Sequence, residues 1–445
     1  MQVLTVNAKD FIRGESSAEY VADGGFSPSS YGLNLTYERG TVHFHETATQ
    51  LGAAVLTGDV IASAHDWNSL GNDKYFLDDG GAFYTLSGTT LTKRQTVAGT
   101  FQSGTSDFLQ FQLTTYATSQ DRVVQLAGGD LATLDSGWWT GLNTLHRHPM
   151  EIVEDELFIA DGNVIYFWNG TSSGTAFTLP ANTNVTSLRK AADGRTLLAF
   201  AGTRIDFSHT VGSSSRVYYC NPSLRDWERE VELVAQVEGT RVVEGVIYCT
   251  WGKNFGYFNG NGLTPMKRLA TSGTTYSHNI QNMEDILLVR DGLKILAYGN
   301  LGAGNVWWNI HQENTYQITD IAYKGDNFLT FCNTNSELYQ VDFDNIGLSG
   351  QFFTNRIDFG QEVKIRRIDL LHDLSNAGGT TRFILYYRDP DNTSNLIEDK
   401  TYSSESTFRT RIHCDITTDI FQMYIAPSSD DIGYKSIRIY YEPIK

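Results

Sequence analysis

The stretch Glu156–Trp168, ELFIADGNVIYFW, decides the fold of this chain. Two short apolar and aromatic runs flank the turn residues Asp161, Gly162 and Asn163. Runs of this composition favour β-strands, and a turn of these residues between them predicts a β-hairpin. Asn169–Gly170 follows as a second turn signal, so the segment indicates antiparallel strands joined by tight connections.

The same hairpin pattern recurs along the chain at a period near 40 residues. Its copies start at residues 74, 122, 156, 195, 245, 285 and 326, with spacings of 48, 34, 39, 50, 40 and 41. A hairpin repeat of this length is typical of β-propellers, whose four-stranded blades cover one another's faces around an axis. The copies are Lys74–Leu86, Arg122–Leu134, Glu156–Trp168, Arg195–Phe207, Gly245–Phe258, Asp285–Tyr298 and Asp326–Val341.

Seven degenerate copies predict a β-propeller of six or seven blades over residues 50–350. No WD dipeptide recurs, so the spacing carries the prediction and sequence identity between the copies does not. A set of β-sandwiches is the competing layout, and it would lack the hairpin period. No segment shows helical periodicity over three turns, and Ile280–Val289, which comes nearest, is assigned to strand.

The sequence pattern changes after about residue 350, where the hairpin repeat ends, and we place a domain boundary at Gly347–Gly350. Alternating apolar and polar residues predict a small antiparallel β-sandwich over residues 351–445. Residues 1–49 form an N-terminal arm with the first strands, of which Thr41–His45 is the clearest. The strand candidates of the C-terminal domain are Thr354–Phe359, Lys364–Leu371, Arg382–Tyr387, Arg409–Ile416, Phe421–Ile425 and Ser436–Tyr441.

The composition bounds the compartment and the partners. The chain has 445 residues and a formal net charge of −17, which argues against direct binding to phosphate backbones. It shows no secretory signal and no apolar run long enough to cross a bilayer, so we expect assembly in a cytoplasm. Four scattered cysteines, with no CxxC pair, are expected to be small buried side chains in a reducing compartment.

Three motifs offer metal chemistry, and each has a stronger structural interpretation. His43 and His45 share one face of a strand but lack a visible third ligand. His146 and His148 alternate in a loop and are expected to form a surface patch. Asp389–Asn395 is rich in calcium-type oxygens but has Ser394 at the sixth position, where an EF-hand loop has glycine. A turn is the favoured interpretation, so no metal site is predicted.

Motifs for catalysis and cofactor binding are missing. The chain has no GxSxG elbow between strand and helix, no GxGxxG and no Walker A loop. A sialidase-like propeller enzyme is the sharpest catalytic alternative, but the Asp-box turns of that class are absent. We therefore expect no enzyme, no catalytic, cofactor-binding or metal-ligating residues, and no cofactor.

Two ends of the chain resemble a known family. Phe11–Gly40 looks like the first segment of phage propeller proteins, and Phe353–His372 (FTNRIDFGQEVKIRRIDLLH), Phe383–Asp389 and Tyr434–Pro443 resemble their terminal β-sandwich. The succession is similar to tail nozzle and packaged-DNA stabilisation proteins of short-tailed bacteriophages. The resemblance implies a homo-oligomeric ring, with a hexamer favoured, that contacts tail or portal-adaptor proteins while DNA passes its channel without specific binding.

The sequence thus predicts a virion structural protein of the tail, a nozzle or adaptor ring subunit involved in DNA ejection. An acidic ring would let DNA slide instead of holding it, which agrees with the net charge. The alternative is a β-propeller binding module for a protein or glycan, with Trp138–Trp139 and Trp307–Trp308 as candidate stacking surfaces. A glycoside hydrolase is the weakest interpretation.

Overall fold

The computed structural model describes residues 1–7, 32–33, 35–38, 41–44, 48–51, 56–65, 74–96, 108–118, 121–126, 134–203, 215–269, 280–283, 286–300, 305–313, 315–323, 328–342, 351–353, 357–373, 380–388, 394–403, 409–429 and 433–444. Every regular element in these residues is a β-strand, so the predicted all-β class is confirmed. Within them no helix could span a membrane. The chain divides into two compact units, 1–49 with 294–314 and 341–445, and 50–293 with 315–340.

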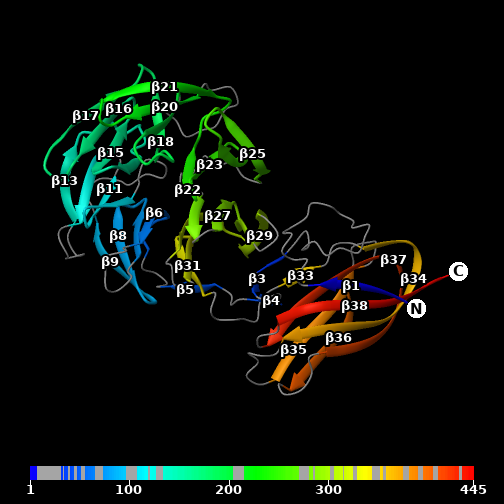
Figure 1. Cartoon of the computed structure of the whole chain (residues 1–445). Helices are drawn as coiled ribbons and strands as arrows, with labels where there is room; N and C mark the ends of the chain where they lie inside the picture. Colours follow the sequence, from blue (N-terminus) through cyan, green and yellow to red (C-terminus); the bar gives the residue numbers. More distant parts are fainter. Residues whose placement is uncertain are drawn as a thin grey trace. The chain divides into compact units, whose positions relative to one another are not determined.

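Seven four-stranded antiparallel sheets form blades in chain order (Figure 1). Blade one consists of β6 (Val60–His65), β7 (Lys74–Asp78), β8 (Ala82–Ser87) and β9 (Thr90–Thr96). Blade two consists of β10 (Phe108–Phe111), β11 (Thr114–Thr118), β12 (Arg122–Leu126) and β13 (Leu134–Thr140). Blades three and four are β14 (Met150–Val153), β15 (Glu156–Asp161), β16 (Val164–Trp168), β17 (Ser173–Thr178), and β18 (Asn184–Lys190), β19 (Leu197–Gly202), β20 (Ser215–Asn221), β21 (Asp226–Leu233).

The remaining three blades follow the same order. Blades five and six are β22 (Gly239–Val243), β23 (Val246–Trp251), β24 (Asn254–Phe258), β25 (Leu263–Arg268), and β26 (Ile280–Met283), β27 (Ile286–Asp291), β28 (Lys294–Asn300), β29 (Asn305–Gln312). Blade seven is β30 (Ile318–Tyr323), β31 (Phe328–Asn333), β32 (Glu337–Asp342) and, as its fourth strand, β5 (Thr49–Leu51) from the beginning of the chain.

The first strands of the blades close a circle. Each contacts the first strand of the next blade, from β6 through β10, β14, β18, β22 and β26 to β30, and β30 contacts β6 again. β5 completes the last sheet, so blade seven contains strands from two distant parts of the chain. The fold is therefore a closed seven-bladed β-propeller, in which closure protects the sheet edges near the axis.

The strand register explains the uneven spacing of the sequence repeat. The second strands of the blades start at residues 74, 114, 156, 197, 246, 286 and 328. Five of the six intervals between these starts are 40 to 42 residues long, and the interval from 197 to 246 is 49 residues. The predicted copy Arg122–Leu134 was wrong by one strand, since it covers the third strand and the start of the fourth. The second strand there, Thr114–Thr118 (TTYAT), has weak apolar character.

The core lies between neighbouring blades. One buried cluster joins Phe158 and Phe177 of blade three to Leu197 and Tyr218 of blade four. Others join blades two and three, four and five, and seven and one. In the last of these, Leu51 of β5 packs in the same cluster as residues of blade one. Burial between sheets is thus what stabilises each blade, because one sheet alone leaves both faces exposed.

A ten-stranded antiparallel sheet contains both ends of the chain. Its path runs β2 (Gly32–Leu33), β33 (Gln351–Phe353), β37 (Arg409–Ser429), β34 (Ile357–Asp373), β38 (Gly433–Pro443), β4 (Thr41–Phe44) and β3 (Leu35–Glu38). β1 (Gln2–Asn7) pairs with β38, while β35 (Thr380–Arg388) pairs with β37 and with β36 (Ser394–Ser403). The propeller is therefore an insertion between strands of this sheet, and its predicted sandwich layering stays a prediction.

A bulge in β34 explains an irregular pattern in the sequence. Ile365, Ile368 and Leu370 are all fully buried, although the first two are three residues apart. The register with β37 and β38 shifts between Ile365 and Arg367, which puts the extra residue into the strand. The two strand candidates Thr354–Phe359 and Lys364–Leu371 lie mainly within one continuous strand.

Candidate binding face of the propeller

One end of every blade gathers two kinds of connection. Because the strands are antiparallel, the loop leading into the first strand lies beside the turn between the second and third strands. In blade three these are the residues before Met150 and the turn at Gly162. We call this end of the ring the leading-loop face, since propeller loops on a rigid scaffold are where binding residues gather.

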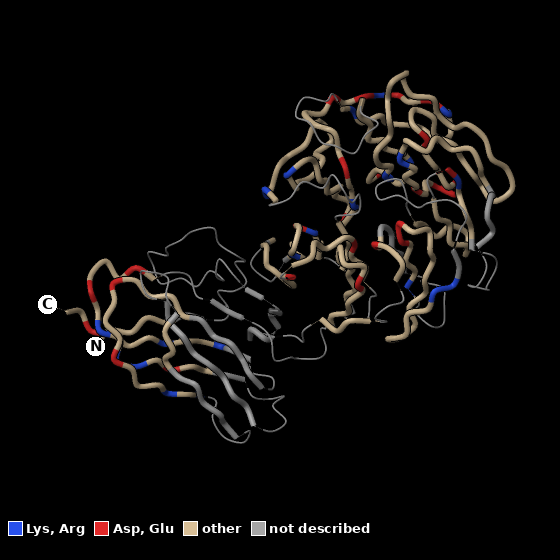
Figure 2. Tube along the Cα trace, turned by 180° about the vertical axis from the view of Figure 1, so that it is seen from behind, with Lys and Arg blue, Asp and Glu red and all other residues tan. Residues whose placement is uncertain are grey.

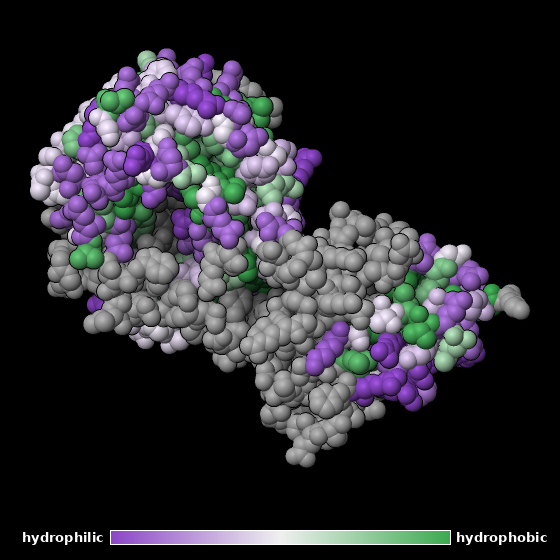
Figure 3. Space-filling model, in the orientation of Figure 1, coloured by the Kyte–Doolittle hydropathy of each residue, from purple (hydrophilic) through white to green (hydrophobic). Residues whose placement is uncertain are grey.

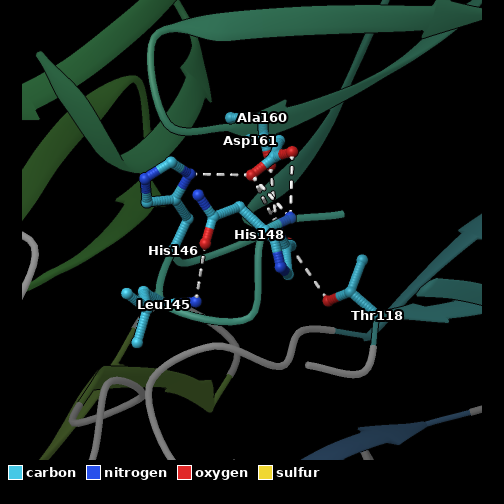
Figure 4. Close-up of polar contacts among 7 residues, drawn as sticks. Thr118, Leu145, His146, His148, Ala160 and Asp161 are labelled. Atoms are coloured by element: carbon cyan, nitrogen blue, oxygen red, sulfur yellow. Dashed lines mark hydrogen bonds and ion pairs between the residues drawn. The ribbon is translucent and has the colours of Figure 1, made fainter. Parts of the chain in front are cut away.

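Asp161 at the end of β15 fixes the leading loop of blade three (Figure 4). Its Oδ1 lies 2.8 Å from Nδ1 of His146, and its Oδ2 accepts the backbone N–H of Asn143 at 3.1 Å. His148 Nδ1 lies 3.2 Å from the carbonyl oxygen of Ala160, so this ring is held by the neighbouring residue of the same strand. The loop is thereby tied to the blade by side chains at both ends of its HRH motif.

Gly162 is required by the same contact. Its φ of +63° is in the left-handed region, which side chains with a Cβ rarely adopt. A Cβ at this position would lie 2.4 Å from Cε1 of His146. The glycine therefore provides both the turn and the space in which the imidazole reaches Asp161.

Blade one repeats the arrangement with other donors. Asp78 at the end of β7 accepts the Thr57 hydroxyl at 2.8 Å, the Tyr84 hydroxyl at 2.6 Å and the backbone N–H of Ala82 at 2.7 Å. Burial and the hydrogen bond to Asp78 raise the pKa of Tyr84 to about 12, so this phenol stays protonated as a donor. Both blades thus use a carboxylate at the end of the second strand to hold the loop before the first.

A buried arginine links two leading loops. Arg147 Nη1 donates to the carbonyl oxygen of Glu238 at 2.6 Å, which joins the loop before blade three to the loop before blade five. Burial lowers the pKa of Arg147 to about 10. Burial also raises the pKa of the Glu238 side chain to about 7, although the charge of Arg147 opposes that shift. Below the leading-loop face, Arg147 and Glu238 therefore form a polar contact that is buried from solvent.

Apolar side chains of the leading loops are exposed to solvent. Leu145 in the leading loop of blade three is 62% exposed, and Val234 in that of blade five is 80% exposed. Tyr316 lies in the leading loop of blade seven and is also exposed. The part of the propeller surface seen in Figure 3 is mainly hydrophilic with scattered hydrophobic residues. The leading-loop face therefore offers separate apolar contacts on loops of three blades.

Of the predicted histidine motifs, the structure describes the side chains of His146 and His148. His148 is fully buried and His146 is mostly covered, so the predicted surface patch at this motif is wrong. The cause is the pair of contacts to Asp161 and Ala160, which draw both rings toward the blade. The side chains of His43 and His45 lie outside the described residues, as do residues 389–393 of the candidate calcium motif. In the described residues, no three His, Cys, Asp or Glu side chains form a group able to hold a metal.

The tryptophan pairs also have packing partners. Trp308 is buried, and Trp307 lies 4.8 Å from Tyr298 between ring centroids. Trp139 makes an edge contact with Tyr166 at 5.4 Å and packs against the core between blades two and three. The side chain of Trp138 lies outside the described residues. These contacts favour the structural interpretation of the pairs over an exposed stacking surface.

The sequence patterns predicted Asp161 and Gly162 only as turn residues and predicted no site at Arg147 or Glu238. A signal was present, because Asp-Gly or Asp-Asp-Gly follows the second strand at residues 78–80, 161–162 and 291–292. Repetition of the dipeptide at one position of the blade points to a shared anchoring role. The link from Arg147 to Glu238 had no such signal, since 91 residues separate its ends.

Comparisons with known proteins found similar solved structures but no matching family. No known family and no curated protein matches the chain. Solved structures similar to it are "YCF48 bound to D1 peptide" (9% identity, 70% of this chain and 99% of that chain, TM-score 0.46), the WD40 propeller domain of Doa1 (7%, 68% and 97%, 0.47) and the Neurospora crassa Pan2 WD40 domain (11%, 68% and 99%, 0.47). The fold class rests on the strand order and the blade contacts given above.

Proposed function

We propose that this chain is a non-catalytic β-propeller binding module whose leading-loop face binds a protein partner. The observation that carries the proposal is that anchored loops present exposed apolar side chains. Asp161 and Arg147 hold the loop that bears Leu145, and Glu238 ends the loop that bears Val234. Loops that are ordered before association lose less conformational entropy when a partner binds.

The polar groups of this face support binding over catalysis. The His146 ring contacts a carboxylate, and the His148 ring is buried against a backbone carbonyl. A general base must reach a substrate proton, and a ring closed off from solvent is poorly placed for that. The packed tryptophans in turn favour a protein partner over a glycan, because stacking on a sugar needs an exposed aromatic face.

Site-specific photocrosslinking tests the proposal. A photoreactive residue at Val234 or at Leu145 is expected to crosslink a partner protein in extracts of the native host. Matched controls are Leu113 and Leu224, which are 80% and 66% exposed but lie in turns at the opposite ends of their blades. Equal crosslinking from all four positions, or crosslinking from the controls alone, would contradict the proposal.

A second proposal keeps the tail-ring function. One observation favours it: β1 and β38 pair over six residues, so the two ends of the chain lie in one sheet. A force on the ends would act on several backbone hydrogen bonds together, which suits a part of a particle under load. We propose with it that the C-terminal strands pack as a β-sandwich through which β37 passes from one layer to the other, since β37 pairs first with β34 and then with β35.

Fractionation of phage particles tests this second proposal. The chain is expected in purified virions, with electron microscopy placing it as a ring at the tail. Its presence only in the soluble fraction outside virions would overturn the tail-ring function. That result would leave the binding-module proposal intact, because the crosslinking experiment does not depend on a particle.

A further inference from the structure

A cluster of arginines covers one face of the C-terminal sheet. Asp369 of β34 lies opposite Arg411 of β37 and Arg438 of β38, and Arg367 lies opposite His413 and Tyr440. Residues opposite one another in antiparallel strands share a face. The other face carries the apolar side chains, of which Ile368, Leu370, Ile412, Ile437 and Ile439 are at most 1% exposed. We call the outer face, with Arg367, Asp369, Arg409, Arg411, His413 and Arg438, the arginine face.

Asp369 organises this face. Its carboxylate contacts Arg409 through a hydrogen bond and lies 3.4 Å from Arg367 Nε and 3.5 Å from Arg411 Nε. The Asp369 side chain is 0% exposed, while those of Arg409 and Arg411 are 41% and 49% exposed. Burial alone would raise the pKa of Asp369, but the hydrogen bond from Arg409 and the nearby charges hold it below its usual value. One buried charge thus positions guanidinium groups that remain open to solvent.

The arginine face has an excess of positive charge on an acidic protein. Three arginines contact the single carboxylate of Asp369 and Arg438 lies opposite it in the register, whereas the chain as a whole carries −17. Neighbouring basic side chains are already balanced, since Lys364 and Arg366 form ion pairs with Asp415. Guanidinium groups bind carboxylates in a forked geometry, so this face fits a partner with carboxylates at regular spacing.

The propeller contains a strand with that spacing. In β21, the outermost strand of blade four, Glu228, Glu230 and Glu232 are exposed at alternate positions. Glu230 pairs with Arg216, but Glu232 has no ion-pair partner among the described residues. Alternate residues of a strand lie about 6.8 Å apart, which is equally the spacing of the exposed positions 409, 411 and 413 on β37. Figure 2 shows the acidic and basic segments of both regions.

We propose that the arginine face of one copy of this chain binds β21 of a second copy. Arg409 and Arg411 of one copy then meet Glu230 and Glu232 of the other. The two surfaces are different, so the contact is heterologous and repeats from copy to copy into a ring or an open chain. The exposed carboxylates at alternate positions of β21 supply the charge that complements the arginine face, which favours a second copy as the occupant. Between two copies the repulsion is screened within about 8 Å at physiological salt, while the paired charges are in contact.

Charge reversal on the full chain tests the contact from both sides. The face variant is Arg411→Glu, which leaves Arg409 on Asp369, and the strand variant is Glu230→Arg with Glu232→Arg, which does not touch Asp369. Each is expected to weaken self-association about tenfold or more in sedimentation at low salt. A mixture of the two variants is expected to restore association. The reversed face of the first variant then meets the reversed β21 of the second, and the original face of the second meets the original β21 of the first. The matched control is Lys253→Glu, an exposed reversal in blade five.

The outcomes are distinct. Salt-sensitive association that each variant weakens, that the mixture restores and that Lys253→Glu leaves unchanged supports the contact. A monomer at every protein and salt concentration overturns it, and so does association that neither variant weakens or that the mixture does not restore. Binding of duplex DNA by a monomer that loses affinity with Arg411→Glu would instead assign the face to a phosphate polymer. The crosslinking test at Val234 is independent of all these results.

Discussion

Two carboxylates, one in each compact unit of the chain, have the same chemistry but different structural roles. Asp161 in the propeller contacts a histidine ring and a backbone N–H. Asp369 in the C-terminal sheet contacts three arginines. The first carboxylate is held mostly by groups without permanent charge and fixes a loop. The second is outnumbered by its partners and supports a face with excess positive charge.

The partners of a carboxylate decide whether it fixes a loop or supports a charged surface. At Asp161 the partners are short and mostly covered, so little charge reaches the solvent above the loop. At Asp369 the partners are long and half-exposed, so the charge they carry is displayed. Removing each carboxylate should therefore have different consequences.

Replacing Asp369 by Asn should have the largest effect. It leaves three guanidinium groups close together with no counter-charge, and removing one partner of a buried pair costs about 3–5 kcal/mol. Because Arg409 and Arg411 are half-exposed, we expect a loss of about 2–3 kcal/mol in the free energy of unfolding of the C-terminal unit. Denaturant unfolding followed by hydrogen exchange of β34 measures it. Asp415→Asn, at an exposed ion pair, is the control and should change stability by about 0–1 kcal/mol.

Gly162→Ala should have the next largest effect, and it isolates the His146 contact. The left-handed backbone costs about 1–2 kcal/mol with a Cβ, and the clash with the imidazole adds to that, for a total of about 2 kcal/mol or more. Gly194→Ala is the matched control, because Gly194 also has positive φ but open space around its Cβ. In a His146→Ala background the two alanine substitutions should cost the same, and thermal unfolding would show it. A larger cost at Gly194 than at Gly162 in the wild-type protein would contradict the close approach of His146 to Gly162.

The pH dependence of stability should differ in sign between the two units. For Asp369 the folded pKa lies below the ordinary value of 3.8, so its contribution is present above that value and is lost as the pH falls. For Glu238 the folded pKa of about 7 lies above the ordinary value of 4.5, so the propeller loses stability as the pH rises from 4.5 to about 7. Glu238→Gln should remove that loss and stabilise the propeller by about 1–2 kcal/mol at neutral pH. No gain at neutral pH would contradict the raised pKa of Glu238, and an equal gain at acidic pH would show that the gain does not come from its titration.

The sequence predicted the parts of this molecule that depend on local pattern. Hairpins such as Glu156–Trp168 combine apolar runs with Asp-Gly turns, so both their existence and their period could be predicted. The predicted repeat copy in the second blade was displaced by one strand. The second strand of that blade, TTYAT, has few apolar residues, and the more apolar run Arg122–Leu126 is its third strand. The closure of blade seven by β5 could not be predicted, since Thr49–Leu51 is three residues long and its partner strand is far away in the chain.

The sites were harder to predict than the fold for the same reason. The HRH motif was visible, but its burial depends on Asp161, which lies 15 residues from His146 and meets it only across the blade. The arginine face combines positions 367, 409, 411 and 438, which the sheet register brings together and no local pattern connects. Its strands could be predicted by alternation, yet the charge that they share appears only when three of them are paired.

The four cysteines give the smallest effect, a difference in reactivity between the two units with no change in stability. Cys220, Cys249 and Cys332 are buried in the propeller, and burial raises the pKa of each thiol, to about 12 for Cys220 and Cys332. Cys414 in β37 is only partly buried, and burial with the nearby charge of Asp415 raises its pKa to about 11. An aromatic disulfide reagent should therefore label Cys414 first, slowly, with a rate that rises about tenfold per pH unit because the thiolate is the reactive form. Mass spectrometry after timed labelling identifies the site, with fully unfolded protein as the control, and faster labelling of any propeller cysteine would mean that its blade opens more readily than the C-terminal sheet.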